Sequence, residues 1–250
     1  MGGLSVWREV RQRLPHESVV YLADGKNCPY GDRTKEEIAA LTRAAVVELI
    51  ARGVKLIVVA CNTATAVAID SLREEFDIPF VGMEPAVKPA ALATKTGTIG
   101  ILATRASLAG ELFLATSAKY ASDVEILPVV GEGFVEAVES DMEQTSEVRE
   151  RVAEVLTPLI EAGADQIVLG CTHYPFLEGV MRGVIGERDV TLVNPAPAVA
   201  RRVEWLLEQG DMVASEEHKA EYSFVTFGGE KYLARITEKA MEIATQDDNQ

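Results

Sequence analysis

The amino-acid sequence predicts an α/β protein with two pseudo-symmetric three-layer lobes, mostly parallel sheets and a cleft between the lobes. Three observations lead to this prediction. Short apolar runs alternate with amphipathic helical patterns, as in proteins whose strands are covered by helices on both faces. Glycines stand where several helices should end. A unit of helix, glycine, strand and cysteine occurs twice in the chain.

The strands are predicted from short segments that are rich in aliphatic residues. Several of these segments show no alternation of apolar and polar residues, which indicates burial on both faces of a parallel sheet. The predicted strands are 19–24, 56–61, 79–83, 97–104, 124–130, 166–171, 190–194 and 222–227.

The helix that follows the first predicted strand has recognisable ends. Thr34 and Glu37 match the T-x-x-E capping box, in which each residue satisfies a backbone N–H of the first turn. Gly53 is placed to stop the helix, because glycine readily adopts the left-handed conformation of a helix end. Its predicted apolar face consists of Ile38, Leu41, Ala45 and Leu49.

The repeated unit aligns residues 51–65 with residues 161–175, an offset of 171 − 61 = 110. Each copy predicts a helix, a glycine stop, a buried strand and then a cysteine at the carboxyl end of the strand. These cysteines are Cys61 and Cys171. Ligands of open α/β sheets bind at the carboxyl ends of strands. Two lobes related by the repeat would therefore bring both thiols to one cleft.

Two proline-rich segments, 83–91 and 194–199, predict where the chain crosses between the lobes. The first lobe is expected to comprise residues 1–86 plus 196–250, and the second lobe residues 87–195. The C-terminal strand and helix would then pack back on the first lobe.

Composition and charge narrow the range of partners. The 24 basic and 39 acidic residues give a net charge of −15, which repels nucleic acids and anionic membrane surfaces. No apolar run approaches the roughly 18–20 residues that span a membrane. The three cysteines suggest no disulfide framework, and neither zinc-ligand spacing nor a nucleotide-binding motif occurs. We therefore expect a cytoplasmic protein that acts on a small molecule without a metal or cofactor.

The paired cysteines predict a proton-transfer reaction. Alone, Cys171 and His173 would also suit half a metal site or a nucleophile with its base, but neither of these needs a second cysteine 110 residues away. A thiol has an ordinary pKa of about 8.5, and a helix N-terminus after each cysteine is expected to lower it. Two thiols on opposite faces of one carbon can remove a proton from one side and deliver one from the other. Such a pair inverts the centre.

Polar residues beside the predicted strand ends are expected to bind a small polar ligand through side-chain donors and backbone N–H groups. His173 could assist a thiol or hold a thiolate as an ion pair. Cys28 belongs to no paired motif and is interpreted as a buried structural thiol. The expected ligand-binding residues are Pro29, Tyr30, Gly31, Asn62, Thr63, Thr104, Ser107 and Thr172.

With these motifs the chain closely resembles the glutamate racemases, cofactor-independent enzymes that make D-glutamate for bacterial peptidoglycan. The resemblance implies that Cys61 and Cys171 are the two acid/base thiols and that His173 assists Cys171. It also implies that Glu139 supports the histidine side, that the residues above bind the substrate and that a homodimer is a possible assembly. The matching segments are GGLSV (2–6), YLAD to CPYG (21–31), ACNTAT (60–65), EPAV (84–87), GCTHYP (170–175) and AVARRV (198–203).

The family opens with a strand and an Asp-Ser-Gly segment that precede a glycine pair, whereas this sequence begins at the glycine pair. The resemblance thus implies a first lobe without that strand and without the aspartate that assists the first cysteine. Two alternatives to glutamate racemisation stay open. One is an aspartate or hydantoin racemase of the same two-thiol design, and the other is an impaired, truncated form that only binds its ligand.

Overall fold

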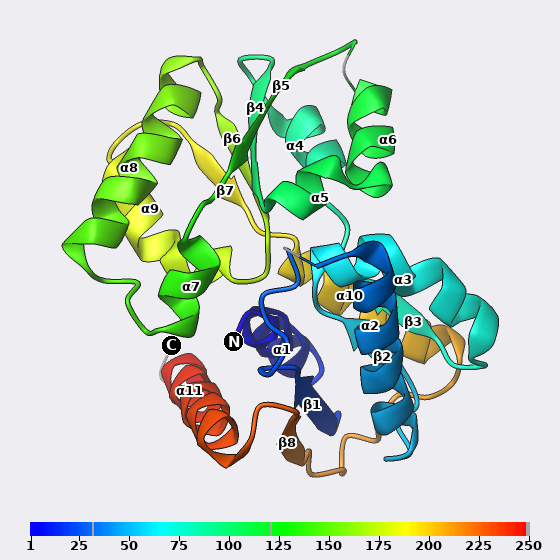
Figure 1. The fold of residues 1–250 in the computed structure, drawn as a ribbon. Helices are drawn as coiled ribbons and strands as arrows, with labels where there is room; N and C mark the ends of the chain where they lie inside the picture. Colours follow the sequence, from blue (N-terminus) through cyan, green and yellow to red (C-terminus); the bar gives the residue numbers. More distant parts are fainter. Residues whose placement is uncertain (32, 121, 249–250) are drawn as a thin grey trace.

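The computed structural model describes residues 1–31, 33–120 and 122–248, and it has the predicted α/β architecture (Figure 1). All eight predicted strands form, and each end lies within two residues of its predicted position. The strands are β1 (Val19–Ala23), β2 (Ile57–Val59), β3 (Phe80–Gly82), β4 (Thr98–Ala103), β5 (Glu125–Val130), β6 (Gln166–Gly170), β7 (Thr191–Val193) and β8 (Tyr222–Thr226).

Helices separate most of these strands. The helices are α1 (Gly3–Arg13), α2 (Lys35–Ile50), α3 (Asn62–Glu75), α4 (Val87–Ala93), α5 (Arg105–Ala109), α6 (Glu111–Tyr120), α7 (Phe134–Glu139), α8 (Ser146–Glu161), the short 3-10 helix η1 (Tyr174–Leu177), α9 (Glu178–Ile185), α10 (Ala196–Gln209) and α11 (Glu230–Asp248).

The second lobe is built on one parallel sheet with the strand order β5-β4-β6-β7. Helices α8 and α9 cover one face of this sheet, and α4 and α6 cover the other (Figure 1). Every residue of β4 and β6 is buried, as their unbroken apolar sequences predict. The carboxyl end of β6, where Cys171 follows, is therefore held between two strands and two helical layers.

The first lobe contains two parallel strand pairs, β1 with β8 and β2 with β3. Glu17 precedes β1 and Lys55 precedes β2, and their side chains form an ion pair at 2.7 Å, so the amino ends of β1 and β2 lie together. Among the described residues, no strand pairs with the edges that β1 and β2 turn toward each other.

The C-terminal strand β8 pairs in parallel with β1. Helix α11 continues from β8 toward α7 of the second lobe (Figure 1). The domain boundaries given above stay a prediction. No helix in the described ranges is both long and apolar enough to cross a membrane.

Helix α2 confirms its predicted cap. The side chain of Thr34 accepts a hydrogen bond from the backbone N–H of Glu37, and the side chain of Glu37 accepts one from the backbone N–H of Thr34. Gly53 follows the helix with φ +74°. The buried face of α2 is shifted by about one residue from the predicted apolar face. Ile38, Thr42 and Val46 are buried, whereas the predicted Leu41, Ala45 and Leu49 are half-buried.

One large apolar cluster includes residues of both lobes. Leu4 and Trp7 of α1, Phe134 of α7 and Ile236 of α11 belong to it. The ring of Phe134 meets the ring of Tyr174 edge to face, with centroids 5.5 Å apart. This contact fixes α7 against the turn that follows β6. Packing therefore decides where the last residue of α7 and the residues after Cys171 can meet.

The central position of β6 predicts a large cost for truncation of its core. Leu169→Ala should lower the free energy of unfolding by about 2–5 kcal/mol, because the side chain is fully buried and its loss leaves a cavity. Urea unfolding followed by circular dichroism measures this change. Leu92→Ala is the matched control, since Leu92 is 72% exposed and its truncation should alter stability by less than about 0.5 kcal/mol. Equal losses in the two variants would contradict this account of the core.

Candidate active site

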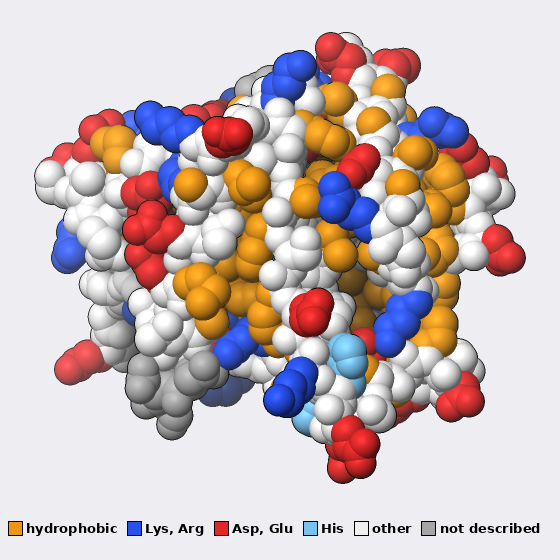
Figure 2. Space-filling view, turned by 90° about the horizontal axis from the view of Figure 1, so that it is seen from below, with side chains coloured by type: hydrophobic (Ala, Val, Ile, Leu, Met, Phe, Trp, Pro, Cys, Tyr) orange, Lys and Arg blue, Asp and Glu red, His pale blue; other side chains and the backbone are white. Residues whose placement is uncertain are grey.

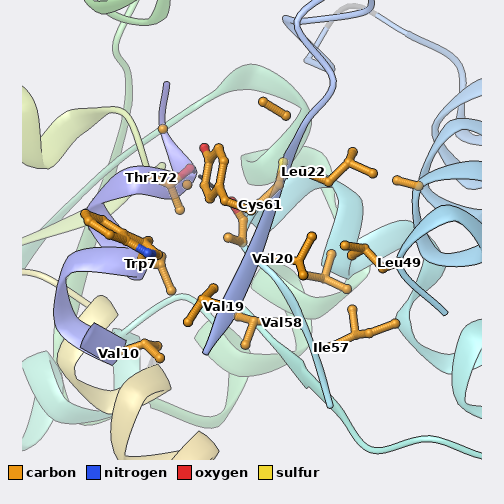
Figure 3. Close-up of a pocket in the computed structure, with 18 of the residues that line it drawn as sticks. Trp7, Val10, Val19, Val20, Leu22, Leu49, Ile57, Val58, Cys61 and Thr172 are labelled. Atoms are coloured by element: carbon orange, nitrogen blue, oxygen red, sulfur yellow. Dashed lines mark hydrogen bonds between the residues drawn. The ribbon is translucent and has the colours of Figure 1, made fainter. Parts of the chain in front are cut away.

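A cavity of about 860 Å³ lies at the carboxyl ends of β2 and β6 and continues between β1 and β2. Figure 3 shows Cys61 and Thr172 toward one end of it and the apolar side chains of Val20, Leu49 and Ile57 toward the other. Figure 2 shows hydrophobic side chains gathered in a recess on the lower face. All twelve predicted site residues line the cavity: Pro29, Tyr30, Gly31, Cys61, Asn62, Thr63, Thr104, Ser107, Glu139, Cys171, Thr172 and His173.

Cys61 is the residue that caps the N-terminus of α3. Its sulfur accepts a hydrogen bond from the backbone N–H of Ala64 at 3.5 Å. Burial nevertheless raises the pKa of the Cys61 thiol, and the hydrogen bonds from Ala64 and Thr63 offset only part of that effect. The expectation that the helix N-terminus leaves this pKa below its ordinary value was therefore wrong, because desolvation outweighs the capping hydrogen bonds.

Cys171 occupies a different local structure from Cys61. A turn and the four-residue helix η1 follow it, and α9 begins only at Glu178, so the prediction of a helix directly after this cysteine was wrong. Burial raises the pKa of Cys171 to about 12, and the backbone N–H of His173 opposes the shift. A negative charge on Cys61 would raise it further, which indicates that the two thiols are close enough to interact. Both thiols are thus protonated near neutral pH.

His173 lies between Cys171 and Glu139. Its Nδ1 atom is 3.7 Å from the Cys171 sulfur, and its Nε2 atom is 2.8 Å from Oε1 of Glu139. A carboxylate can only accept hydrogen bonds, so Nε2 carries the proton and Nδ1 presents a lone pair to the thiol. In this tautomer the imidazole can accept a proton from Cys171.

The Glu139 carboxylate, at the end of α7, is surrounded by donors. Tyr232 of α11 donates to Oε2 at 3.0 Å, and the α-amino group of Met1 donates to Oε1 at 2.9 Å. Burial alone would raise the pKa of Glu139, but the hydrogen bond from His173 and the Met1 ammonium together hold it well below its ordinary range. Burial lowers the pKa of His173 despite the opposing effect of Glu139. The resting pair is therefore a carboxylate with a neutral imidazole.

A chain of hydroxyl groups lies on the opposite side of the cavity and joins the two lobes. Thr104 caps α5 by accepting the backbone N–H of Ser107, and its hydroxyl donates to the Ser107 hydroxyl at 2.9 Å. The Ser107 hydroxyl is in turn 3.2 Å from that of Thr63 in α3. These groups can reorient to donate or accept, which suits the binding of a carboxylate.

Asn62 and Thr172 lie beside the two cysteines. Asn62 is 4% exposed, and within the described ranges neither its side-chain nitrogen nor its oxygen has a hydrogen-bond partner. A buried amide without partners is costly unless a ligand or water satisfies it. The hydroxyl of Thr172 donates to the backbone carbonyl of Ala60 at 3.3 Å, and this contact draws the end of β6 toward the end of β2.

The segment after β1 forms a third wall of the cavity. The peptide bond between Cys28 and Pro29 is cis, and the hydroxyl of Tyr30 donates to Asp24 at 2.7 Å. A Cβ atom at Gly31 would lie only 3.9 Å from Cβ of Thr104, so this glycine faces the second lobe at close range. The turn thus brings backbone close to the cavity, as the sequence predicts.

Three residues of the site were missed or misread in the sequence. Asp24 orients Tyr30, Tyr232 binds Glu139, and the Cys28 thiol lies 3.7 Å from Oε1 of Glu139. Cys28 does pack against the core, but it also lines the cavity. Asp24 and Cys28 belong to the matching segment 21–31, which was the available signal. Tyr232 carries no local signal, since it reaches the site through the packing of α11.

The sequence profile of the Asp/Glu/Hydantoin racemases matches residues 5–203 of the chain. The chain belongs to this family. A glutamate racemase of Herpetosiphon aurantiacus is 48% identical over 94% of the chain and 92% of the relative, and one of Deinococcus radiodurans is 44% identical over 94% and 81%.

Solved structures of family members share the fold. A glutamate racemase isoform of Bacillus anthracis superposes with a TM-score of 0.86 and 31% identity, covering 96% of this chain and 90% of that one. The Escherichia coli glutamate racemase, in complex with L-glutamate and the activator UDP-MurNAc-ala, superposes with a TM-score of 0.81 and 33% identity over 96% and 91%. The two-lobe α/β architecture is therefore that of the family.

The raised thiol pKa predicts a loss of stability in alkali. Because the pKa of Cys171 rises from 9.0 to about 12 on folding, the native state favours the neutral thiol. The contribution of the neutral Cys171 thiol to the free energy of unfolding is complete below pH 9.0. It is lost as the pH rises toward about 12. Melting temperatures between pH 7 and pH 11 should fall less steeply for Cys171→Ser than for the natural sequence. The same slope for both proteins would show that Cys171 ionisation is not coupled to unfolding.

Proposed function

We propose that the chain interconverts L-glutamate and D-glutamate without a cofactor, by proton transfer between the substrate α-carbon and two thiols. The observation that carries this proposal is that Cys61 and Cys171, each following a parallel strand, line the same cavity. Membership of the racemase family and the identity to glutamate racemases support it. The proposed role is the supply of D-glutamate for peptidoglycan in the cytoplasm, and a homodimer is the proposed assembly.

In the proposed mechanism one cysteine acts as thiolate and the other as thiol. The thiolate takes the α-proton, the electron pair of the broken C–H bond delocalises into the substrate carboxylate, and the opposite thiol donates its proton to the other face of the carbon. One proton is gained and one is lost, so the substrate leaves with inverted configuration. The buried thiolate is a stronger base than a thiolate in water, which reduces the mismatch with a weakly acidic C–H group.

The thiolate on the Cys171 side forms with help from His173. The Cys171 proton moves to Nδ1, and Glu139 stabilises the resulting imidazolium through Nε2–H. On the other side, the backbone N–H of Ala64 stabilises a Cys61 thiolate. Within the described ranges, no acidic or basic side chain hydrogen-bonds Cys61. The two half-reactions are therefore assisted unequally.

The substrate would be held by neutral donors at the thiol end of the cavity. The unpartnered amide of Asn62 and the hydroxyls of Thr63, Ser107 and Thr104 provide hydrogen bonds for carboxylate groups. This arrangement suits an anionic amino acid bound by an acidic protein, because recognition depends on short-range hydrogen bonds. An aspartate or hydantoin derivative could use the same donors, so turnover of these compounds should be compared with turnover of glutamate.

A second candidate function is ligand binding without turnover. The lack of an acid/base side chain at Cys61 favours it, since removal of such a partner typically lowers a rate by about 10²–10⁴-fold. In that case glutamate would raise the melting temperature without any exchange of its α-proton.

Deuterium exchange tests the main proposal. In heavy water, both enantiomers of glutamate should acquire deuterium at the α-carbon, and the loss of optical rotation should follow. Cys61→Ser and Cys171→Ser should each reduce racemisation by about 10²-fold or more, because a hydroxyl is a far weaker acid than a thiol. Cys28→Ser removes the third thiol that lines the cavity, which takes no part in the proposed proton transfer, and it should still racemise. Full racemisation by either of the first two variants would refute the two-thiol assignment.

The role of Glu139 can be tested by the pH profile of the rate. Glu139→Gln keeps a side-chain oxygen but removes the charge that raises the pKa of His173. The pKa of His173 should then fall further, and the acid limb of the profile should move to lower pH. The maximal rate should drop by about 10²-fold, because the imidazolium loses its counter-charge. An acid limb that stays in place would contradict coupling between Glu139 and His173.

A further inference from the structure

Three side chains from distant parts of the sequence meet beside Cys171. They are Cys28 in the segment after β1, Glu139 at the end of α7 and His173 in the turn after β6. One ligand atom from each (a sulfur, a carboxylate oxygen and an imidazole nitrogen) lies within 4.8 Å of the other two. All three side chains are half-buried and line the cavity. A small ion can therefore reach them from the cavity.

The donor set and its spacing suit a zinc ion. Zinc prefers thiolate, imidazole and carboxylate ligands at about 2.0–2.3 Å, which places tetrahedral ligands about 3.3–3.7 Å from one another. The Cys28 sulfur is 3.7 Å from Oε1 of Glu139, already at that separation. Nε2 of His173 is 2.8 Å from the same oxygen and would need to move by about half an ångström to leave the direct hydrogen bond.

The charges around the three ligands also favour a cation. A Cys28 thiolate and the Glu139 carboxylate would supply two negative charges, and the whole chain carries −15. The positive group that now contacts Glu139 is the α-amino group of Met1, at 2.9 Å. Arg235, on the same helix as Tyr232, is engaged by Asp141. A divalent cation would have to compete with this ammonium for Oε1 of Glu139.

We propose that Cys28, Glu139 and His173 form an inhibitory site for Zn²⁺. Binding releases the Cys28 proton to solvent, and zinc bonds to the thiolate, to Oε1 of Glu139 and to Nε2 of His173, with water in the fourth position. The proton that Nε2 carries must then reside on Nδ1. Nδ1 becomes a donor and can no longer accept the proton of Cys171. The inhibitory effect rests on the proposed function, whereas the binding site does not.

Cobalt spectroscopy of the full chain tests the binding site directly. Titration with Co²⁺ should give d–d bands of a tetrahedral ion and a thiolate charge-transfer band that saturates at one equivalent, and Zn²⁺ should bleach both. Cys28→Ser should abolish the charge-transfer band. Glu139→Gln, with its thiol intact, should weaken Co²⁺ binding by more than about 10-fold, because loss of a residue that only orients a ligand already costs about 10–100-fold. Cys61→Ser and Cys171→Ser are the matched thiol controls and should keep the band. Circular dichroism of each variant confirms that it is folded.

Two results would overturn the proposed site. One is the absence of tetrahedral bands at saturating Co²⁺, and the other is a charge-transfer band that survives in Cys28→Ser but disappears in Cys61→Ser or Cys171→Ser. The latter would mean that the paired thiols bind the metal. Zn²⁺ inhibition of α-proton exchange that is relieved in Cys28→Ser supports the inhibitory role, and equal inhibition of both proteins refutes it. If the protein catalyses no α-proton exchange when no metal is added, the proposed function is contradicted. The cobalt spectra would still test the metal site, because they do not depend on activity.

Discussion

The hydrogen bond between His173 and Glu139 is the interaction on which the arrangement of the site depends. Glu139 ends α7, and its carboxylate also contacts Tyr232 of α11 and the thiol of Cys28. The same bond fixes the imidazole tautomer, so it determines both the position of the ring and the direction in which a proton can move. Edge-to-face packing of Phe134 on Tyr174 holds the two partners in register. The hydrogen bond between His173 and Glu139 thus determines both the position of the imidazole and its ability to accept a proton from Cys171.

Desolvation dominates the electrostatics of the thiols. The N–H groups around Cys61 and Cys171 favour the thiolate, but removal of the sulfur atoms from water has the larger and opposite effect on their pKa. A reactive thiolate is therefore rare in the resting protein and becomes more favourable only when a base or a bound cationic group compensates it. A substrate ammonium is such a group.

Local patterns in the sequence were sufficient for the strands, the capping box at Thr34 and the two cysteines at strand ends, because each depends on neighbours along the chain. The common cavity could also be anticipated, since parallel strands present their carboxyl ends at one edge. The contacts of Glu139 with Tyr232 and Cys28 span 93 and 111 residues, and only the packed helices create them. The direction of the thiol pKa shifts could not be predicted from the sequence either, because the burial of each sulfur atom depends on the whole fold.

The two strand pairs of the first lobe have a consequence for the behaviour of the chain in solution. The edges of β1 and β2 that face each other have no strand partner among the described residues, and apolar side chains such as Val20 and Ile57 line the cavity beside them. Such edges are templates for intermolecular strand addition, the first step toward aggregation. The charge of −15 opposes the approach of a second molecule over about one Debye length, roughly 8–10 Å at physiological salt. Colloidal stability of this chain is thus electrostatic, and it weakens as ionic strength rises.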